Sequence, residues 1–149
     1  MSTKTLGWLL TVFPILGLLS WATAGLPTSP AGEFEGGYAA FAAEIGGNPD
    51  RIHVNMGLAA IAYSILIAAF ISLRGKVAEN GNSVFTALAG VLIVIGYAGT
   101  IAENGAYSAA ASLSSEGLVP EAVSMLTLAT TAGGFGTAIL ALGIGLLGY

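Results

Sequence analysis

The chain has 149 residues, of which 55% are hydrophobic and 8% charged, with a formal net charge of −4. A soluble domain carries roughly 25% charged residues, so this composition and the mean hydropathy of +0.84 exclude an ordinary soluble fold and indicate an integral membrane protein. Cysteine is absent and basic residues are few, which excludes a disulfide framework, a thiolate site and a nucleic-acid-binding surface.

Four segments are long and apolar enough to cross a bilayer, which takes about 20 mostly apolar residues. They cover about residues 6–24, 53–73, 84–102 and 120–148. The first contains Pro14, which removes a backbone donor and predicts a kink. The fourth begins at Pro120, where the missing N–H has no cost. We therefore predict an all-α integral membrane protein, a single domain of four transmembrane helices packed as an up-down bundle.

The first span has a second interpretation. Lys4, the apolar stretch after it and the small residues 22–24 have the order of a secretory signal with a cleavage site. The apolar run is long for such a signal. We therefore expect the segment to be retained as a true transmembrane span.

Basic residues set the expected orientation. Lys4 precedes the first span, and Arg74 and Lys76 lie between the second and third, whereas Arg51 lies on the opposite side. Because cytoplasmic loops are enriched in basic residues, we predict that both termini are cytoplasmic. Every acidic residue except Glu79 falls on the outer side, which predicts a negative outer face that attracts cations or a basic partner.

The connections carry their own signals. The outer loop 25–52 is the longest, and its apolar segment 38–45 predicts a short helix in the outer interface. The inner connection contains a turn signal at 79–82, and its short length makes the second and third spans antiparallel neighbours. Residues 106–113 favour helix, so we expect the third helix to continue above the membrane until Gly117 ends it.

The fourth span carries small residues at alternating steps of three and four, which places them on one face of a helix. They are Ser124, Thr127, Thr131, Gly134, Ala138, Ala141, Gly145 and Gly148. Close backbone approach holds helices together in a bilayer, so we interpret this stripe as a packing face. Thr130, Gly133 and Thr137 form a second patch beside it. Two patches favour contacts with two neighbours; the alternative is that both serve one four-helix bundle.

His53 is the only histidine and lies at the outer end of the second span, with Gly57 one turn further on. Histidine on a membrane helix can ligate haem or a chlorophyll-type pigment, and Gly57 would leave room for a flat ring. The simpler interpretation, which we favour, is a polar residue hydrogen-bonded to a neighbouring helix.

Glu103 lies at the predicted outer end of the third span. Because the second and third spans are neighbours, we expect its carboxylate to lie near Arg51 and His53. An acid close to hydrocarbon is costly unless it is paired or hydrated, so we interpret Glu103 as an ion pair that clamps two helices, or as a solvated residue. The functional alternative is a proton or cation site. We favour the structural interpretation because no ionisable residue falls in the middle of a predicted span.

The sequence shows no motif for a catalytic, nucleotide or metal site, so we do not expect an enzyme. Its small-residue helix faces favour a structural or accessory subunit of a larger membrane complex, which packs against other membrane subunits or against itself and contacts lipid or pigment. The alternative is an oligomeric small channel or transporter that uses Glu103 and the acidic outer face for cations. We expect it in a prokaryotic plasma membrane.

Overall fold

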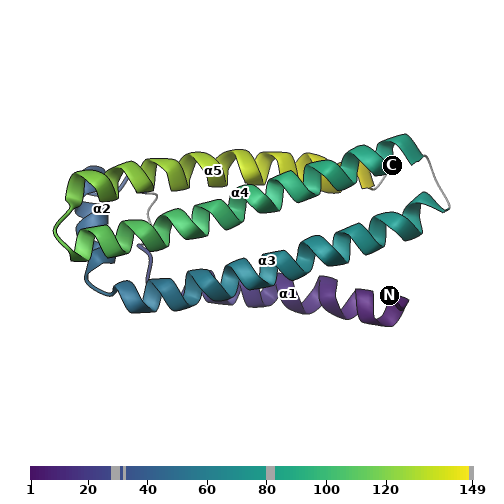
Figure 1. Cartoon of the computed structure of the whole chain (residues 1–149), viewed down its shortest axis with the longest axis horizontal. Coiled ribbons are helices and arrows are strands. Elements are labelled where there is room, and N and C mark those ends of the chain that lie inside the picture. The colour runs from purple at the N-terminus through teal and green to yellow at the C-terminus, as the bar shows by residue number, and fades with distance from the viewer. Residues whose placement is uncertain (28–30, 32, 80–82, 148–149) are drawn as a thin grey trace.

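The structure is a computed structural model of the chain (Figure 1), and it describes residues 1–27, 31, 33–79 and 83–147. Within these residues every regular element is an α-helix. The helices are α1 (Thr3–Thr23), α2 (Gly37–Gly46), α3 (Pro49–Ala78), α4 (Ser83–Ser115) and α5 (Val119–Leu147). Residues 80–82 of the expected turn, and residue 148 at the expected end of the fourth span, lie outside the described residues.

Four of the helices, α1, α3, α4 and α5, are long and apolar enough to cross a membrane. They run alternately in opposite directions along the long axis, which brings both termini to the same end (Figure 1). The predicted all-helical, four-span, up-down fold is therefore confirmed. The short helix expected over 38–45 is α2, which lies at the end opposite the termini. We call the end with the termini the basic end and the α2 end the acidic end.

The helix boundaries have local causes. Pro49 opens α3, and Pro120 stands in the first turn of α5, where its missing N–H costs nothing. Ser2 caps α1 by accepting a hydrogen bond from the Thr5 backbone N–H at 3.1 Å. Gly117, with φ of 80°, makes the turn between α4 and α5 in a conformation that glycine adopts easily.

The helix α4 is longer than the predicted third span. Its 33 residues correspond to about 50 Å at 1.5 Å per residue, and Val84–Ser115 contains a stretch long and apolar enough to cross a membrane. The predicted continuation of the helix through 106–113 is present, and α4 is continuous through residue 102. Glu103 therefore stands inside a long helix and not at its end.

The helices pack mainly in chain order, with α1 against α3, α3 against α4 and α4 against α5, while α2 covers α4 and α5 at the acidic end. The α4–α5 seam is the tightest of these contacts. A Cβ atom on Gly99 would lie 2.8 Å from the Cα of Gly136, and one on Gly136 would lie 2.8 Å from the Gly96 carbonyl oxygen. Glycines thus let the two backbones touch, which is how helices associate in lipid.

Two apolar clusters fill the interior along the bundle axis. The first lies at the acidic end beneath α2 and includes Tyr107 of α4. The second lies towards the basic end and includes Tyr97 of α4 with Leu66 of α3. Glu103 lies between Tyr97 and Tyr107 on the same helix, so it falls at the boundary of the two clusters.

Candidate functional site

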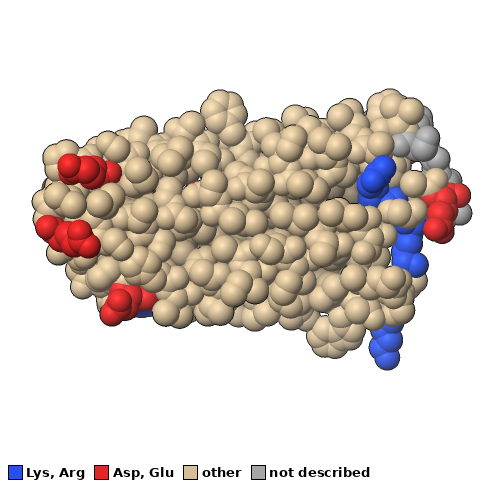
Figure 2. Space-filling view, viewed as in Figure 1, with Lys and Arg blue, Asp and Glu red and all other residues tan. Residues whose placement is uncertain are grey.

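Charged side chains gather at the two ends of the molecule, mostly acids at the α2 end and mostly Lys and Arg near the termini, where one acidic patch also lies (Figure 2). Among the residues that the structure describes, Glu103 departs from this pattern. Two contacts on α4 serve as reference points: Gly90, against which the Arg74 side chain lies near the basic end, and Ser112, which contacts His53 near the acidic end. Glu103 lies 13 residues from Gly90 and 9 residues from Ser112. These separations are about 20 Å and 14 Å along the helix axis. Glu103 is therefore close to the middle of the apolar zone.

The surroundings of Glu103 come from three helices. Its half-buried carboxylate lies against Gly133 of α5, where an added Cβ would overlap the carboxylate oxygens. The phenols of Tyr63 on α3 and Tyr107 on α4 lie within electrostatic range of it. Tyr63 also stacks on Tyr97, with ring centroids 5.7 Å apart. Glycine backbone and phenol rings thus lie around a carboxylate in the middle stretch of the bundle.

The sequence had led us to expect Glu103 next to Arg51, but the structure does not bring these two residues together. Arg51 stands in the first turns of α3, where its Nε–H donates to the carbonyl oxygen of Thr23 at 2.7 Å. It therefore ties the end of α1 to α3 at the acidic end. The expected pair assumed that the third span ends at residue 102. Because His53 contacts Ser112, the start of α3 is level with residues nine or more positions beyond Glu103 on α4, so Glu103 lies too deep in the bundle to reach Arg51.

His53 is also out of reach of Glu103. Its Nε2 lies 2.9 Å from the hydroxyl oxygen of Ser112 on α4, the contact with a neighbouring helix that the simpler interpretation describes. Gly57 lies one turn further on, and a Cβ there would meet no atom within 4 Å. Both residues line a groove of about 230 Å³ between α3 and α4. A haem or pigment metal bound through Nε2 would have to displace Ser112.

Asn104 lines the same groove from α4, and sequence reasoning did not single it out. Its side chain is 1% exposed, and its amide nitrogen and oxygen have no hydrogen-bond partner in the described part of the chain. Leaving a buried polar group unpaired costs roughly 1–3 kcal/mol. The available signal was its neighbour Glu103, a charged residue within an apolar helix, which sequence analysis placed at the outer end of the span.

The predicted packing stripe of α5 faces away from the bundle. Its members Thr127, Thr131, Gly134, Ala138, Ala141 and Gly145 are all exposed. The buried face of the helix is a neighbouring one that contains Ala122, Leu126, Ala129, Gly133, Gly136 and Gly143. Of the second predicted patch, Gly133 belongs to this buried face, whereas Thr137 is exposed. The stripe is therefore available to lipid or to another chain.

Comparisons with protein-family models, with curated proteins and with solved structures find no significant match.

Proposed function

We propose that the protein moves protons across the membrane as a small channel or transporter and that Glu103 is the group that carries them. The observation that supports this proposal is the half-buried Glu103 carboxylate near the middle of the apolar zone, far from the charged ends of the molecule. A charged group at this depth is expensive, and ionisable residues there usually serve ion pathways or proton relays.

The donor set around Glu103 favours a proton over a metal cation. Phenols and glycine backbone adjoin the carboxylate, whereas Ca²⁺ takes about six to eight oxygen ligands and Mg²⁺ an octahedron of them. A proton needs one acceptor at a time and short steps between hydroxyl groups. Tyr63 and its stacking partner Tyr97 supply hydroxyls on the basic side of Glu103.

On the acidic side, hydroxyl groups continue towards the surface. Tyr107 lies about one turn from Glu103 along α4 and interacts electrostatically with Tyr38 of α2. The Tyr38 hydroxyl is in turn 3.4 Å from the Thr130 hydroxyl of α5. These groups would deliver protons from the acidic end, whose carboxylates raise the local cation concentration.

Proton flux into proteoliposomes tests this function. The wild type, Glu103→Gln and Glu116→Gln would be reconstituted with a pH-sensitive dye inside and driven by a potassium diffusion potential. Glu116 is the matched control because it lies exposed at the acidic end. We expect Glu103→Gln to abolish flux and Glu116→Gln to retain it, with both variants keeping the wild-type circular dichroism. Equal flux in the wild type and Glu103→Gln, or no flux in any protein, would refute the proposal.

The exposed stripe of α5 supports a second candidate function, a subunit that assembles with other membrane subunits or with itself. Small residues at a lipid-facing surface allow close contact with another helix. Gly134→Leu would then reduce the assembled mass in mild detergent, whereas Gly105→Leu, on an exposed site of α4 with the same free space, would not. Unchanged assembly of Gly134→Leu would remove this candidate.

Both candidates share one proposed location. We place the protein in a prokaryotic plasma membrane with its basic end, and thus both termini, in the cytoplasm. The support is the position of Lys4, Arg74 and Lys76 at that end, because short cytoplasmic loops are rich in basic residues.

A further inference from the structure

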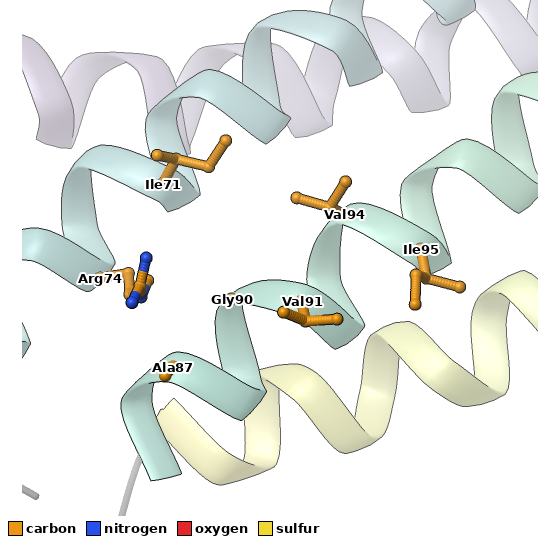
Figure 3. Close-up of a pocket in the computed structure, with 7 residues that line it drawn as sticks. All are labelled: Ile71, Arg74, Ala87, Gly90, Val91, Val94 and Ile95. Carbon is orange, nitrogen blue, oxygen red and sulfur yellow. The ribbon is translucent and has the colours of Figure 1, made fainter. Parts of the chain in front are cut away.

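A second groove lies between α3 and α4 near the basic end (Figure 3). Its volume is about 360 Å³, and its walls are apolar, formed by Ile71 of α3 and by Val91, Val94 and Ile95 of α4. The exception is Arg74, which projects from α3 towards α4 on the same side of the groove as Gly90 (Figure 3). The groove thus joins an apolar trough to a single guanidinium group.

The position of Arg74 depends on Gly90. A Cβ on Gly90 would lie 2.7 Å from the Cδ and 3.3 Å from the Nε of Arg74, so a larger residue at this position would shift the Arg74 side chain. The guanidinium is exposed, and it forms no hydrogen bond or ion pair with another residue in the described part of the chain. The side chain is therefore packed along its stem and unpaired at its charged end.

Apolar surface continues beyond Arg74 towards the basic end. Val84 is 72% exposed and Phe85 47% exposed, and Val84 precedes Gly90 by six residues, or about 9 Å along α4. Arg74 thus lies short of the apolar limit of the molecule. The charge of Arg74 at this depth is stabilised when an anion lies beside it at the edge of the apolar zone.

We propose that this groove binds an anionic phospholipid, with an acyl chain along the apolar trough and the phosphate group on Arg74. A guanidinium group binds phosphate through two parallel hydrogen bonds, which a lysine cannot reproduce. Lys4 in the first turn of α1 and Lys76 in the last turn of α3 stand at the same end, together with the acid Glu79. The net charge of this end with Arg74 is positive, which favours an anionic headgroup over a zwitterionic one. The inference does not depend on the proposed role of Glu103.

Native mass spectrometry of the protein in detergent, titrated with phosphatidylglycerol or with phosphatidylcholine of the same chain length, tests this site. Arg74→Gln should weaken phosphatidylglycerol binding by about fivefold, the effect of one basic residue on an anionic lipid. Lys4→Gln removes the same charge at the same end from α1, away from the groove, and should change binding by less than about twofold. Phosphatidylcholine carries the same phosphate, so Arg74→Gln should also weaken its binding, whereas Lys4→Gln should leave phosphatidylcholine binding unchanged.

Arg74→Lys separates phosphate recognition from charge alone and provides a second variant if Arg74→Gln does not fold. It keeps the positive charge but loses the two-bond geometry, so its affinity should fall below that of the wild type. Equal binding of the two lipids to the wild type would overturn the proposal. Equal losses in Arg74→Gln and Lys4→Gln would also overturn it, because they would indicate diffuse surface charge. A dimer that lipid does not dissociate, with a second copy of the chain in the groove, would overturn it as well.

Discussion

Adding one methyl group at Gly136 tests the α4–α5 seam at its closest point. A Cβ there would lie 2.8 Å from the Gly96 carbonyl oxygen and 3.0 Å from the Thr100 backbone nitrogen. Both are backbone atoms of α4, so no side-chain rotation can relieve the contact and the two helices must separate. Gly134 on the same helix is the matched control, because a Cβ there would meet nothing within 4 Å.

The expected magnitude follows from these distances. Carbon atoms pack best at about 3.5–4.0 Å, and a gap of 0.5–1 Å forfeits a quarter to a half of each dispersion contact. Moving the helices apart enough to admit Gly136→Ala loosens the whole seam, and overpacking of this kind costs about 1–3 kcal/mol. The gain in helix propensity from glycine to alanine, about 1 kcal/mol, applies at both positions and cancels in the comparison. Gly136→Ala should therefore unfold about 1–3 kcal/mol more easily than Gly134→Ala.

Unfolding in mixed micelles with increasing dodecyl sulfate provides the measurement. Tryptophan fluorescence is a suitable probe, because Trp21 packs edge-on against Tyr107 of α4 with ring centroids 5.4 Å apart. A difference between the two alanine variants of less than about 0.5 kcal/mol, the range of ordinary surface substitutions, would show that α4 and α5 do not touch at these glycines.

Three further changes test other parts of the structure. Asn104→Leu should raise the free energy of unfolding by about 1 kcal/mol, since it replaces a buried, unpaired amide with an apolar side chain; a loss of similar size in the same unfolding titration would show that the amide has a partner. Arg51→Gln should lower the free energy of unfolding by about 1.5 kcal/mol by removing a charged donor to the Thr23 carbonyl, and unchanged stability would mean that this contact does not hold α1. The purified protein should show no visible absorption band that depends on His53, because Ser112 engages its Nε2; such a band, lost in His53→Ala, would contradict this assignment.

Sequence reasoning located the helices well because apolar runs of this length have few alternatives to a membrane span. It misplaced Glu103 because a charged residue after an apolar run resembles the end of a span. The feature that accommodates the carboxylate inside the bundle is tertiary, since Gly133 on α5 leaves room for it. That complementarity joins residues 30 positions apart, and helix periodicity carries no information about it.

The packing face of α5 was unpredictable for a related reason. Small residues occur on two faces of this helix, and each meets the requirement for close approach. The choice between them depends on α4, whose Gly96 and Gly99 form the complementary surface for Gly136. Periodicity identifies such faces but does not identify their partners, so the stripe through Gly134 was assigned to packing although it is exposed.

The depth of α4 next to Glu103 is the measurement that tests the central claim most directly. The chain has no cysteine, so single cysteines can carry nitroxide labels at three exposed positions: Gly105 beside Glu103, Glu116 at the acidic end and Gly75 at the basic end. In lipid vesicles, we predict that the label at 105 is reached by dissolved oxygen and shielded from a water-soluble nickel chelate, whereas the labels at 116 and 75 are reached by the chelate. Chelate access at 105 equal to that at 116 would place Glu103 in water and contradict the account.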